Sequence, residues 1–267
     1  MLRRKCMFGE IEVRDEPAER ALYLNGQKQG GAYFRPSADE VNDALPAGEP
    51  GPVCSSAYAL GWIVAGLMNP TGTGLMIGLG SGAGATQLLY SVPMVDLVIV
   101  EIDPVMVQVA LDEFPLLNYY MDRGRLSIEI EDIDDFLVRN NDTWDFALAD
   151  AYDSGQEVID DHIETLCERS PHIYVNIIDR LMGISMQRIA MMMESKGTSV
   201  VEIFKTVPLA YSSMGFRERS NWILTNQVPD MARLAEYPIY PYFDDIHAHD
   251  TRMAWDLMLA NTLSEVV

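Results

Sequence analysis

Residues 75–84 read LMIGLGSGAG, a short apolar run followed at once by four glycines in seven residues. The apolar residues Leu75–Ile77 predict a buried β-strand, and Ala85–Tyr90 predicts a helix. Glycines let the backbone turn tightly and approach a ligand, while the helix N-terminus offers free N–H groups. On its own this pattern fits either a nucleoside-binding loop or a tight turn between a strand and a helix.

Strand and helix patterns alternate along the chain beyond this loop. Predicted strands cover Asp96–Glu101, Leu126–Ile130, Trp144–Ala149 and Ile173–Ile178, and predicted helices cover Pro104–Phe114, Asp132–Arg139, Ile159–Arg169 and Met182–Met193. Several strand runs are continuously apolar, which is typical of strands covered on both faces. We therefore expect a doubly wound, mostly parallel α/β sheet, with Ser199–Val207 and Asn221–Thr225 as a late edge pair.

The residues before the loop follow other patterns. Residues 9–34 alternate apolar and polar side chains around the turn Asn25-Gly26, which predicts short strands joined by hairpins. Residues 35–53 are rich in proline, glycine and acidic residues, which predicts a loop or linker. Ala57–Met68 predicts a buried helix. We expect an N-terminal β region over residues 1–55 and an α/β catalytic domain over 56–267.

Composition narrows the partners and the compartment. The 267 residues hold 19 Lys+Arg and 40 Asp+Glu, a formal charge of −21, so phosphate backbones and anionic membranes are poor partners. This acidity is compatible with a cationic substrate but more often belongs to the solvated surface of a soluble protein. The longest apolar run has 12 residues, too few to span a bilayer, which takes about 20. Three isolated cysteines fit a reducing, cytoplasmic compartment and no zinc site.

Carboxylates follow three of the predicted strands, where an open α/β sheet holds its ligands. Glu101 lies 23 residues after Gly78 and could accept both hydroxyls of a ribose. Asp132 could accept from the amine of adenine, and an N-cap for the next helix explains it nearly as well. Asp150 and Asp153 could hold an ammonium ion and take its proton, although a strand-end turn is the plain alternative.

Together these segments resemble the spermidine synthase (polyamine aminopropyltransferase) family from about Ala21 to Gln227. The resemblance lies in LYLNGQKQ (22–29), LMIGLGSGAG (75–84), IVEIDPVMVQVALDEFP (99–115), EDIDDF (131–136), ALADAYDSG (147–155) and VPLAYSSMGFRERSNWILTN (207–226). It implies a class I methyltransferase-like domain that moves an aminopropyl group from decarboxylated S-adenosylmethionine to putrescine or a related amine. It also implies a homodimer and a reaction without a metal.

The resemblance assigns a role to each candidate residue. The nucleoside would be held by Gln29, Gly78, Gly80, Gly82, Glu101 and Asp132. Asp150 would be the base that takes a proton from the attacking amine. The amine side would be lined by Tyr58, Asp153 and Tyr211.

The chain also departs from the family pattern. Ser81 stands where the family has an aspartate expected to bind the ammonium of the aminopropyl group. Tyr58 is followed by Ala59-Leu60 instead of the usual Gln/His-Glu, and the segment after Asp153 lacks the usual proline. These changes indicate a divergent member. They leave open methyl transfer from intact S-adenosylmethionine, whose carboxylate a serine would not repel, and a non-catalytic polyamine- or nucleoside-binding protein.

Overall fold

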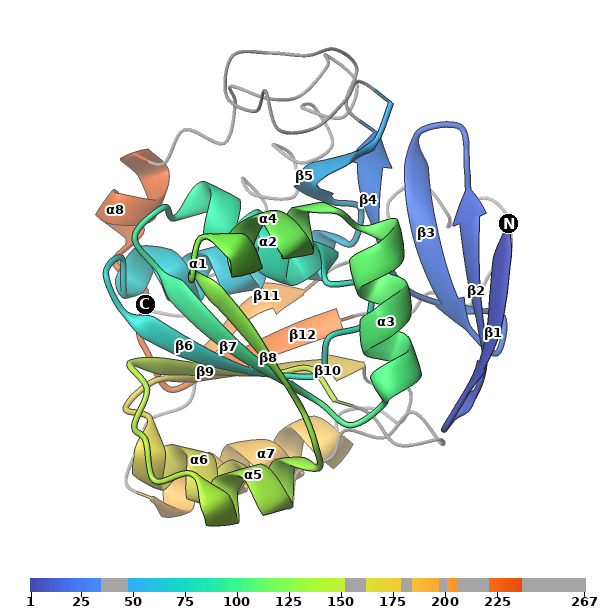
Figure 1. The fold of residues 1–267 in the computed structure, drawn as a ribbon. Helices are drawn as coiled ribbons and strands as arrows, with labels where there is room; N and C mark the ends of the chain where they lie inside the picture. Colours follow the sequence, from blue (N-terminus) through green and yellow to red (C-terminus); the bar gives the residue numbers. More distant parts are fainter. Residues whose placement is uncertain (35–47, 152–161, 179–183, 197–200, 206–220, 237–267) are drawn as a thin grey trace.

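The computed structural model describes residues 1–34, 48–151, 162–178, 184–196, 201–205 and 221–236, which form two sheets (Figure 1). The first is antiparallel, in the order β1 (Leu2–Cys6), β2 (Gly9–Asp15), β3 (Glu19–Leu24), β4 (Gln27–Phe34), β5 (Pro50–Cys54). The second has the order β11 (Val201–Lys205), β12 (Asn221–Thr225), β10 (Ile173–Ile178), β9 (Phe146–Ala149), β6 (Thr73–Ile77), β7 (Asp96–Glu101), β8 (Leu126–Ile130). Strands β6 to β10 are parallel, and β12 runs antiparallel to both of its neighbours. The predicted α/β class and the late edge pair are confirmed.

Helices cover both faces of the larger sheet. They are η1 (Ala57–Ala59), α1 (Leu60–Met68), α2 (Ala83–Ser91), α3 (Pro104–Glu113), α4 (Leu116–Asp122), α5 (Ile133–Arg139), α6 (Ile163–Arg169), α7 (Ile184–Ser195) and α8 (Met231–Glu236). Figure 1 shows α1, α2 and α4 on one face and α5, α6 and α7 on the other. Within the described ranges, no helix has the length and apolar character needed to cross a membrane.

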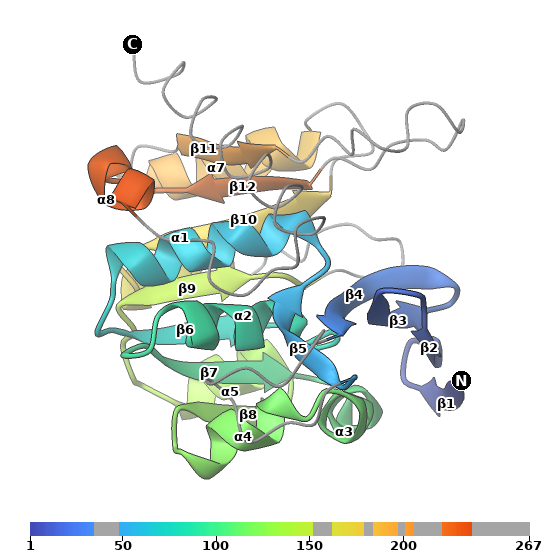
Figure 2. The ribbon, with the colours of Figure 1, turned by 90° about the horizontal axis from the view of Figure 1, so that it is seen from above.

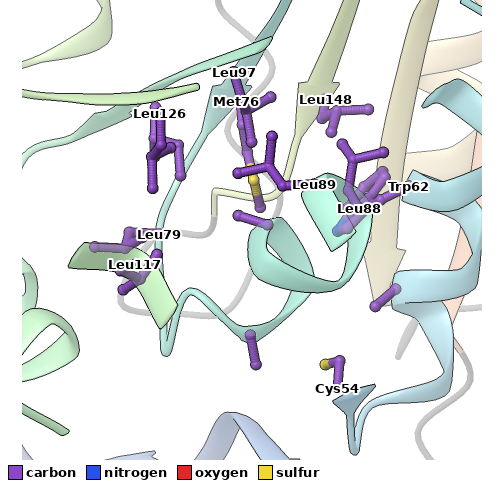
Figure 3. Packing of buried hydrophobic residues seen from close by; sticks show 14 of the residues in the cluster. Cys54, Trp62, Met76, Leu79, Leu88, Leu89, Leu97, Leu117, Leu126 and Leu148 are labelled. Atoms are coloured by element: carbon purple, nitrogen blue, oxygen red, sulfur yellow. The ribbon is translucent and has the colours of Figure 1, made fainter. Parts of the chain in front are cut away.

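Each face of the sheet has its own apolar core, because successive side chains of a strand point to opposite faces. On the α1/α2 face, Figure 3 shows Leu88 and Leu89 of α2 gathered with Trp62 of α1 and with Met76 and Leu148 of the strands. The other core is formed by β-strand residues with Phe136, Leu137, Ile163, Leu166, Ile189 and Met193 of α5, α6 and α7. Burying each large apolar side chain contributes about 1.5–3 kcal/mol, so the two cores fix the strand order and the strand ends.

The strand order reverses its direction between β6 and β9. From β6 the chain moves outward through β7 to β8, and it then returns to the other side of β6 to add β9 and β10. The Gly78 N–H donates to the Val100 carbonyl (2.9 Å), and the Asp150 N–H donates to the Ile77 carbonyl (3.0 Å). In doubly wound sheets the ligand crevice lies at such a reversal, outside the carboxyl ends of the strands.

The five-stranded sheet packs next to α3, as the view in Figure 2 shows. The Met7 N–H donates to Asp103 Oδ2 (2.8 Å), while Asp103 Oδ1 accepts from Val105 (2.8 Å) and Met106 (3.3 Å) at the start of α3. Asp103 is 0% exposed, so one carboxylate both caps a helix and anchors the β1–β2 turn. At the opposite edge of this sheet, the Cys54 N–H of strand β5 donates to Gln87 Oε1 of α2 (3.2 Å).

The prediction of a loop over residues 35–53 is wrong at its end. Pro50–Cys54 is strand β5, which pairs with β4, and residues 35–47 lie outside the described residues. Pro50 and Pro52 suggested a loop because proline cannot donate to a ladder, but β5 is an edge strand of its sheet, where proline is tolerated. The division of the chain at residues 55 and 56 stays a prediction.

We predict that Asp103→Ala lowers the free energy of unfolding by about 2–4 kcal/mol, because it removes a helix cap and the acceptor of a buried N–H. Urea denaturation followed by circular dichroism measures the loss. Asp103→Asn keeps an acceptor oxygen and should lose less, and Asp122→Ala, an exposed residue at the end of α4, should change little. Equal losses for Asp103→Ala and Asp122→Ala would contradict the anchoring role.

Candidate functional site

The glycine loop lies directly against the strand end that has Asp150. Gly78, Gly80 and Gly82 have φ angles of +89°, +53° and +72°, which L side chains rarely adopt. A Cβ on Gly78 would lie 2.6 Å from the Asp150 carbonyl oxygen, and one on Gly82 would lie 2.6 Å from Leu117 Cδ1. Glycine is therefore required here both for the backbone conformation and for the close approach of a neighbouring strand.

Glu101 closes the other side of the loop. Its side chain is 9% exposed, with Oε2 accepting from the Leu79 N–H (2.9 Å) and Oε1 accepting from the Asp103 N–H (3.0 Å). Burial raises the pKa of this carboxyl above its ordinary value. The Ile102 N–H is a further backbone partner of this carboxyl. A carboxylate has about four lone-pair sites, so three backbone N–H groups leave some acceptor capacity at this position. The structure thus places Glu101 against the glycine loop, and its contact with a ribose stays a prediction.

Asp132 caps helix α5. Its Oδ1 accepts from the Asp134 N–H (2.8 Å), and its backbone carbonyl accepts from Phe136. The N-cap explanation of Asp132 is thus what the hydrogen bonds support, and its contact with adenine stays a prediction.

Asp150 sits at the carboxyl end of β9 with two polar neighbours. The amide Nδ2 of Asn176 donates to Asp150 Oδ1 (2.8 Å), and the Tyr58 hydroxyl also donates to this carboxylate. Desolvation by the surrounding protein raises the pKa of Asp150 to about 7, and the two hydrogen bonds oppose that rise only in part. An acid that titrates near neutral pH can both take up and release a proton under physiological conditions.

Tyr58 reaches Asp150 from a separate element. Tyr58 belongs to η1, just before α1. Its ring packs edge-on against the buried ring of Trp62, with 6.0 Å between the ring centroids. This contact fixes the ring with its hydroxyl toward the end of β9. The structure thus brings Tyr58 next to Asp150, and its predicted contact with a substrate stays a prediction.

Asn176 is a site residue that the sequence analysis missed. It lies on β10, which is parallel to β9, and the pairing of Val175 with Ala149 makes Asn176 and Asp150 the next pair. A single amide within the apolar strand Ile173–Ile178 was the available signal, because a buried polar group needs a partner. That partner could not be identified until the order of the strands was known.

Strand β4 crosses the glycine loop at Gln29 and Gly30. A Cβ on Gly80 would lie 3.4 Å from the Gln29 carbonyl oxygen, and a Cβ on Gly30 would lie only 2.5 Å from Ser81 Oγ. Ser81 is 3% exposed, and its Oγ accepts from the Ala83 N–H (3.3 Å). Gln29 is thus next to the loop, its contact with a nucleoside stays a prediction, and Ser81 of the loop packs against Gly30 of β4.

Two predicted substrate residues, Asp153 and Tyr211, lie outside the described residues. Within the part of the chain that the structure describes, no group of three or more His, Cys, Asp or Glu side chains could hold a metal ion. Within the described ranges, the site is composed of the glycine loop, Glu101 and the group formed by Asp150, Tyr58 and Asn176. The loop, Glu101 and Asp150 lie at the carboxyl ends of β6, β7 and β9, while Asn176 lies within β10 and Tyr58 comes from η1.

The geometry defines an α/β protein of the class I methyltransferase-like kind, preceded by an antiparallel β-sheet. No protein-family model matches the sequence, and no curated protein matches it either. Solved structures of spermidine synthases have the same fold.

Three of these structures illustrate the likeness. The spermidine synthase from Thermotoga maritima is 11% identical with a TM-score of 0.61, covering 99% of this chain and 87% of that one. A spermidine synthase in complex with the transition-state analogue AdoDATO is 13% identical with a TM-score of 0.59, and the match covers 99% of this chain and 87% of that one. A probable spermidine synthase from Corynebacterium glutamicum ATCC 13032 is 16% identical with a TM-score of 0.58, and the match covers 84% of this chain and 78% of that one. At these identities the likeness establishes the fold.

We predict that Asp150→Asn stabilises the protein at neutral and alkaline pH. The folded state keeps the Asp150 proton up to about pH 7, whereas the unfolded chain releases it near pH 4. The folded state therefore binds more protons between these values, and its stability falls as pH rises through this window. Asparagine does not ionise, so the variant should gain about 2–4 kcal/mol at pH 8 and nothing at pH 4.

Urea denaturation at pH 4, 6 and 8 measures this difference. Asp142→Asn, at an exposed position, is the matched control and should give no pH-dependent gain. A constant difference between Asp150→Asn and the wild type across the three pH values would contradict a raised pKa.

Proposed function

We propose that this chain is a spermidine synthase-like transferase. It transfers an aminopropyl group from decarboxylated S-adenosylmethionine to putrescine or a related amine. The observation that carries the proposal is the position of Asp150, which lies against the glycine loop at the reversal of the sheet with a pKa near neutrality. The fold shared with spermidine synthase structures supports the same reaction class.

The chemistry requires a base at this point. A protonated amine has no lone pair, so Asp150 accepts one proton from the ammonium group, breaking an N–H bond and forming an O–H bond. The freed lone pair attacks the carbon next to the sulfonium in line with the C–S bond. As the C–N bond forms, the C–S bond breaks, and its electron pair makes the sulfur a neutral thioether in methylthioadenosine. Positioning and one proton acceptor therefore account for the step.

The remaining candidate residues bind either the nucleoside or the amine. On the nucleoside side, Glu101 accepts hydrogen bonds from the ribose hydroxyls with its remaining lone pairs. The loop around the sulfonium end is shaped by Gln29, Gly78, Gly80 and Gly82. Asp132 lies near adenine. On the amine side, Tyr58 orients the acceptor next to Asp150, and Asp153 and Tyr211 complete this side.

We predict that Asp150→Asn lowers turnover by about 100- to 10,000-fold, the usual contribution of a positioned acid or base. Nucleoside binding should change little, because Asp150 acts on the amine. The assay offers decarboxylated and intact S-adenosylmethionine with a panel of amines and detects methylthioadenosine or adenosylhomocysteine by mass spectrometry. Asp142→Asn is the control. Full activity of Asp150→Asn would overturn the role of the base, and absence of any product from the wild type would favour a binding protein.

A second candidate, methyl transfer from intact S-adenosylmethionine, is favoured by Ser81. Its Oγ is occupied by the Ala83 N–H and packed against Gly30, so this point of the loop presents no carboxylate toward a ligand. The family aspartate at this position would attract an aminopropyl ammonium and repel the carboxylate of intact S-adenosylmethionine. Serine does neither.

We predict that Ser81→Asp weakens binding of intact S-adenosylmethionine about tenfold relative to the decarboxylated form, because like charges repel at short range. Ser81→Asn has the same shape without the charge and should change both affinities alike. Isothermal titration calorimetry with both compounds measures the ratio. If the wild type binds the decarboxylated compound more tightly than the intact one, methyl transfer is contradicted.

A further inference from the structure

Asn176 carries a buried amide in strand β10, whose other side chains are aliphatic or aromatic. It is 1% exposed and lies on β10 between β9 and β12, where its backbone is paired with Ile223 of β12. Its neighbours in β10 alternate between the two apolar cores, with Tyr174 on the α1/α2 face and Val175 on the opposite face. Alternation puts the Asn176 side chain on the α1/α2 face.

Asp150 follows the same alternation on the adjacent strand. Leu148 belongs to the core on the α1/α2 face and Ala149 to the other core, so Asp150 points to the α1/α2 face next to Asn176. The 2.8 Å bond from Asn176 Nδ2 to Asp150 Oδ1 is thus set by the register of two paired strands. Asp150 directly follows the last residue of β9 and Asn176 lies within β10, so the paired strands place the two side chains next to each other.

Among the described residues, Asp150 has two side-chain hydrogen-bond partners, and they differ in what they allow. The Nδ2 group of an asparagine only donates, so the oxygen that faces it must remain an acceptor. The hydroxyl of Tyr58 can donate or accept, so it imposes no such choice. Asn176 therefore distinguishes the two oxygens of the carboxylate and Tyr58 does not.

We propose that Asn176 determines which oxygen of Asp150 takes the proton, by reserving Oδ1 as a permanent acceptor and leaving Oδ2 as the basic oxygen. This inference rests on the proposed function. The proton moves from the ammonium nitrogen to Oδ2, and Oδ1 becomes the carbonyl oxygen of the acid. Oδ1 still accepts from Nδ2 after the transfer, so the pair does not rearrange during the step. Asn176 acts through Asp150 and is a positioning residue.

Within the described ranges, the groups that face Asp150 come from three elements. Tyr58 approaches from η1, Asn176 from β10, and the backbone of Gly78 from the loop after β6. Among the described residues, desolvation and the bonds from Asn176 and Tyr58 are the causes that shift the pKa of Asp150, with no charged side chain among them. Removing the Asn176 amide takes away a bond that stabilises the charged form, so the pKa must rise further.

The test compares Asn176→Leu, of similar size, with Ile177→Val, which alters the same strand on its opposite face. Carbon-13 NMR follows the Asp150 carboxyl between pH 4 and 9 in the protein without substrates. We expect the midpoint to rise by about one pH unit in Asn176→Leu and to stay unchanged in Ile177→Val. Asn176→Ser, which is too short to donate to Asp150, provides the same comparison with a smaller change in polarity if the leucine variant does not fold.

Turnover is measured in parallel as a function of pH. The rate rises with pH as Asp150 ionises, so this limb should move up by about one unit in Asn176→Leu, with kcat lowered about 10- to 100-fold and the KM of the nucleoside unchanged. An unchanged NMR midpoint in folded Asn176→Leu or Asn176→Ser overturns the inference. A raised midpoint in a protein whose wild type yields no transfer product overturns the proposed function but supports the coupling of Asn176 to Asp150.

Discussion

The close contact between the Gly78 backbone and the Asp150 carbonyl is the constraint on which the site depends. It joins the loop after β6 to the end of the neighbouring strand β9, at the position where the order of the sheet reverses. Gly78 lacks the Cβ that would lie 2.6 Å from the Asp150 carbonyl oxygen, so the loop can pass directly beside Asp150. Two further site residues are placed against the same loop: Glu101 through the Leu79 N–H, and Gln29 through the crossing of β4 over Gly80.

Burial makes one carboxylate chemically different from the many others of this acidic chain. The 40 Asp and Glu residues give the protein its charge of −21, and most of that charge has no connection with the site. Asp103 is more deeply buried than Asp150, yet it accepts three N–H bonds and serves as an anchor. Asp150 accepts from one amide and one hydroxyl in a desolvated position, which raises its pKa and makes it reactive at a cost in stability.

Local patterns were reliable where the chemistry is local. Asn25-Gly26 turns between β3 and β4, as its sequence indicates. Asp132 was ambiguous because an acid before a helix serves as a cap in the same way whether or not it also contacts a ligand. Pro50–Cys54 was misassigned because the tolerance of proline depends on whether a strand lies at the edge of its sheet, and strand order is a property of the whole fold.

The sequence by itself determined the alternation of strands and helices, the glycine loop and the carboxylates at the strand ends, because periodicity and turn chemistry act over a few residues. It therefore also predicted that Glu101 and Asp150 lie at the ligand-binding edge of a parallel sheet, whereas the order of the strands brought both of them to the loop. Only the tertiary structure decided that Asn176 pairs with Asp150 and that Ser81 packs against Gly30. Both contacts join residues far apart in the chain, and the register of neighbouring strands and the crossing of one sheet over another are fixed only when the cores pack.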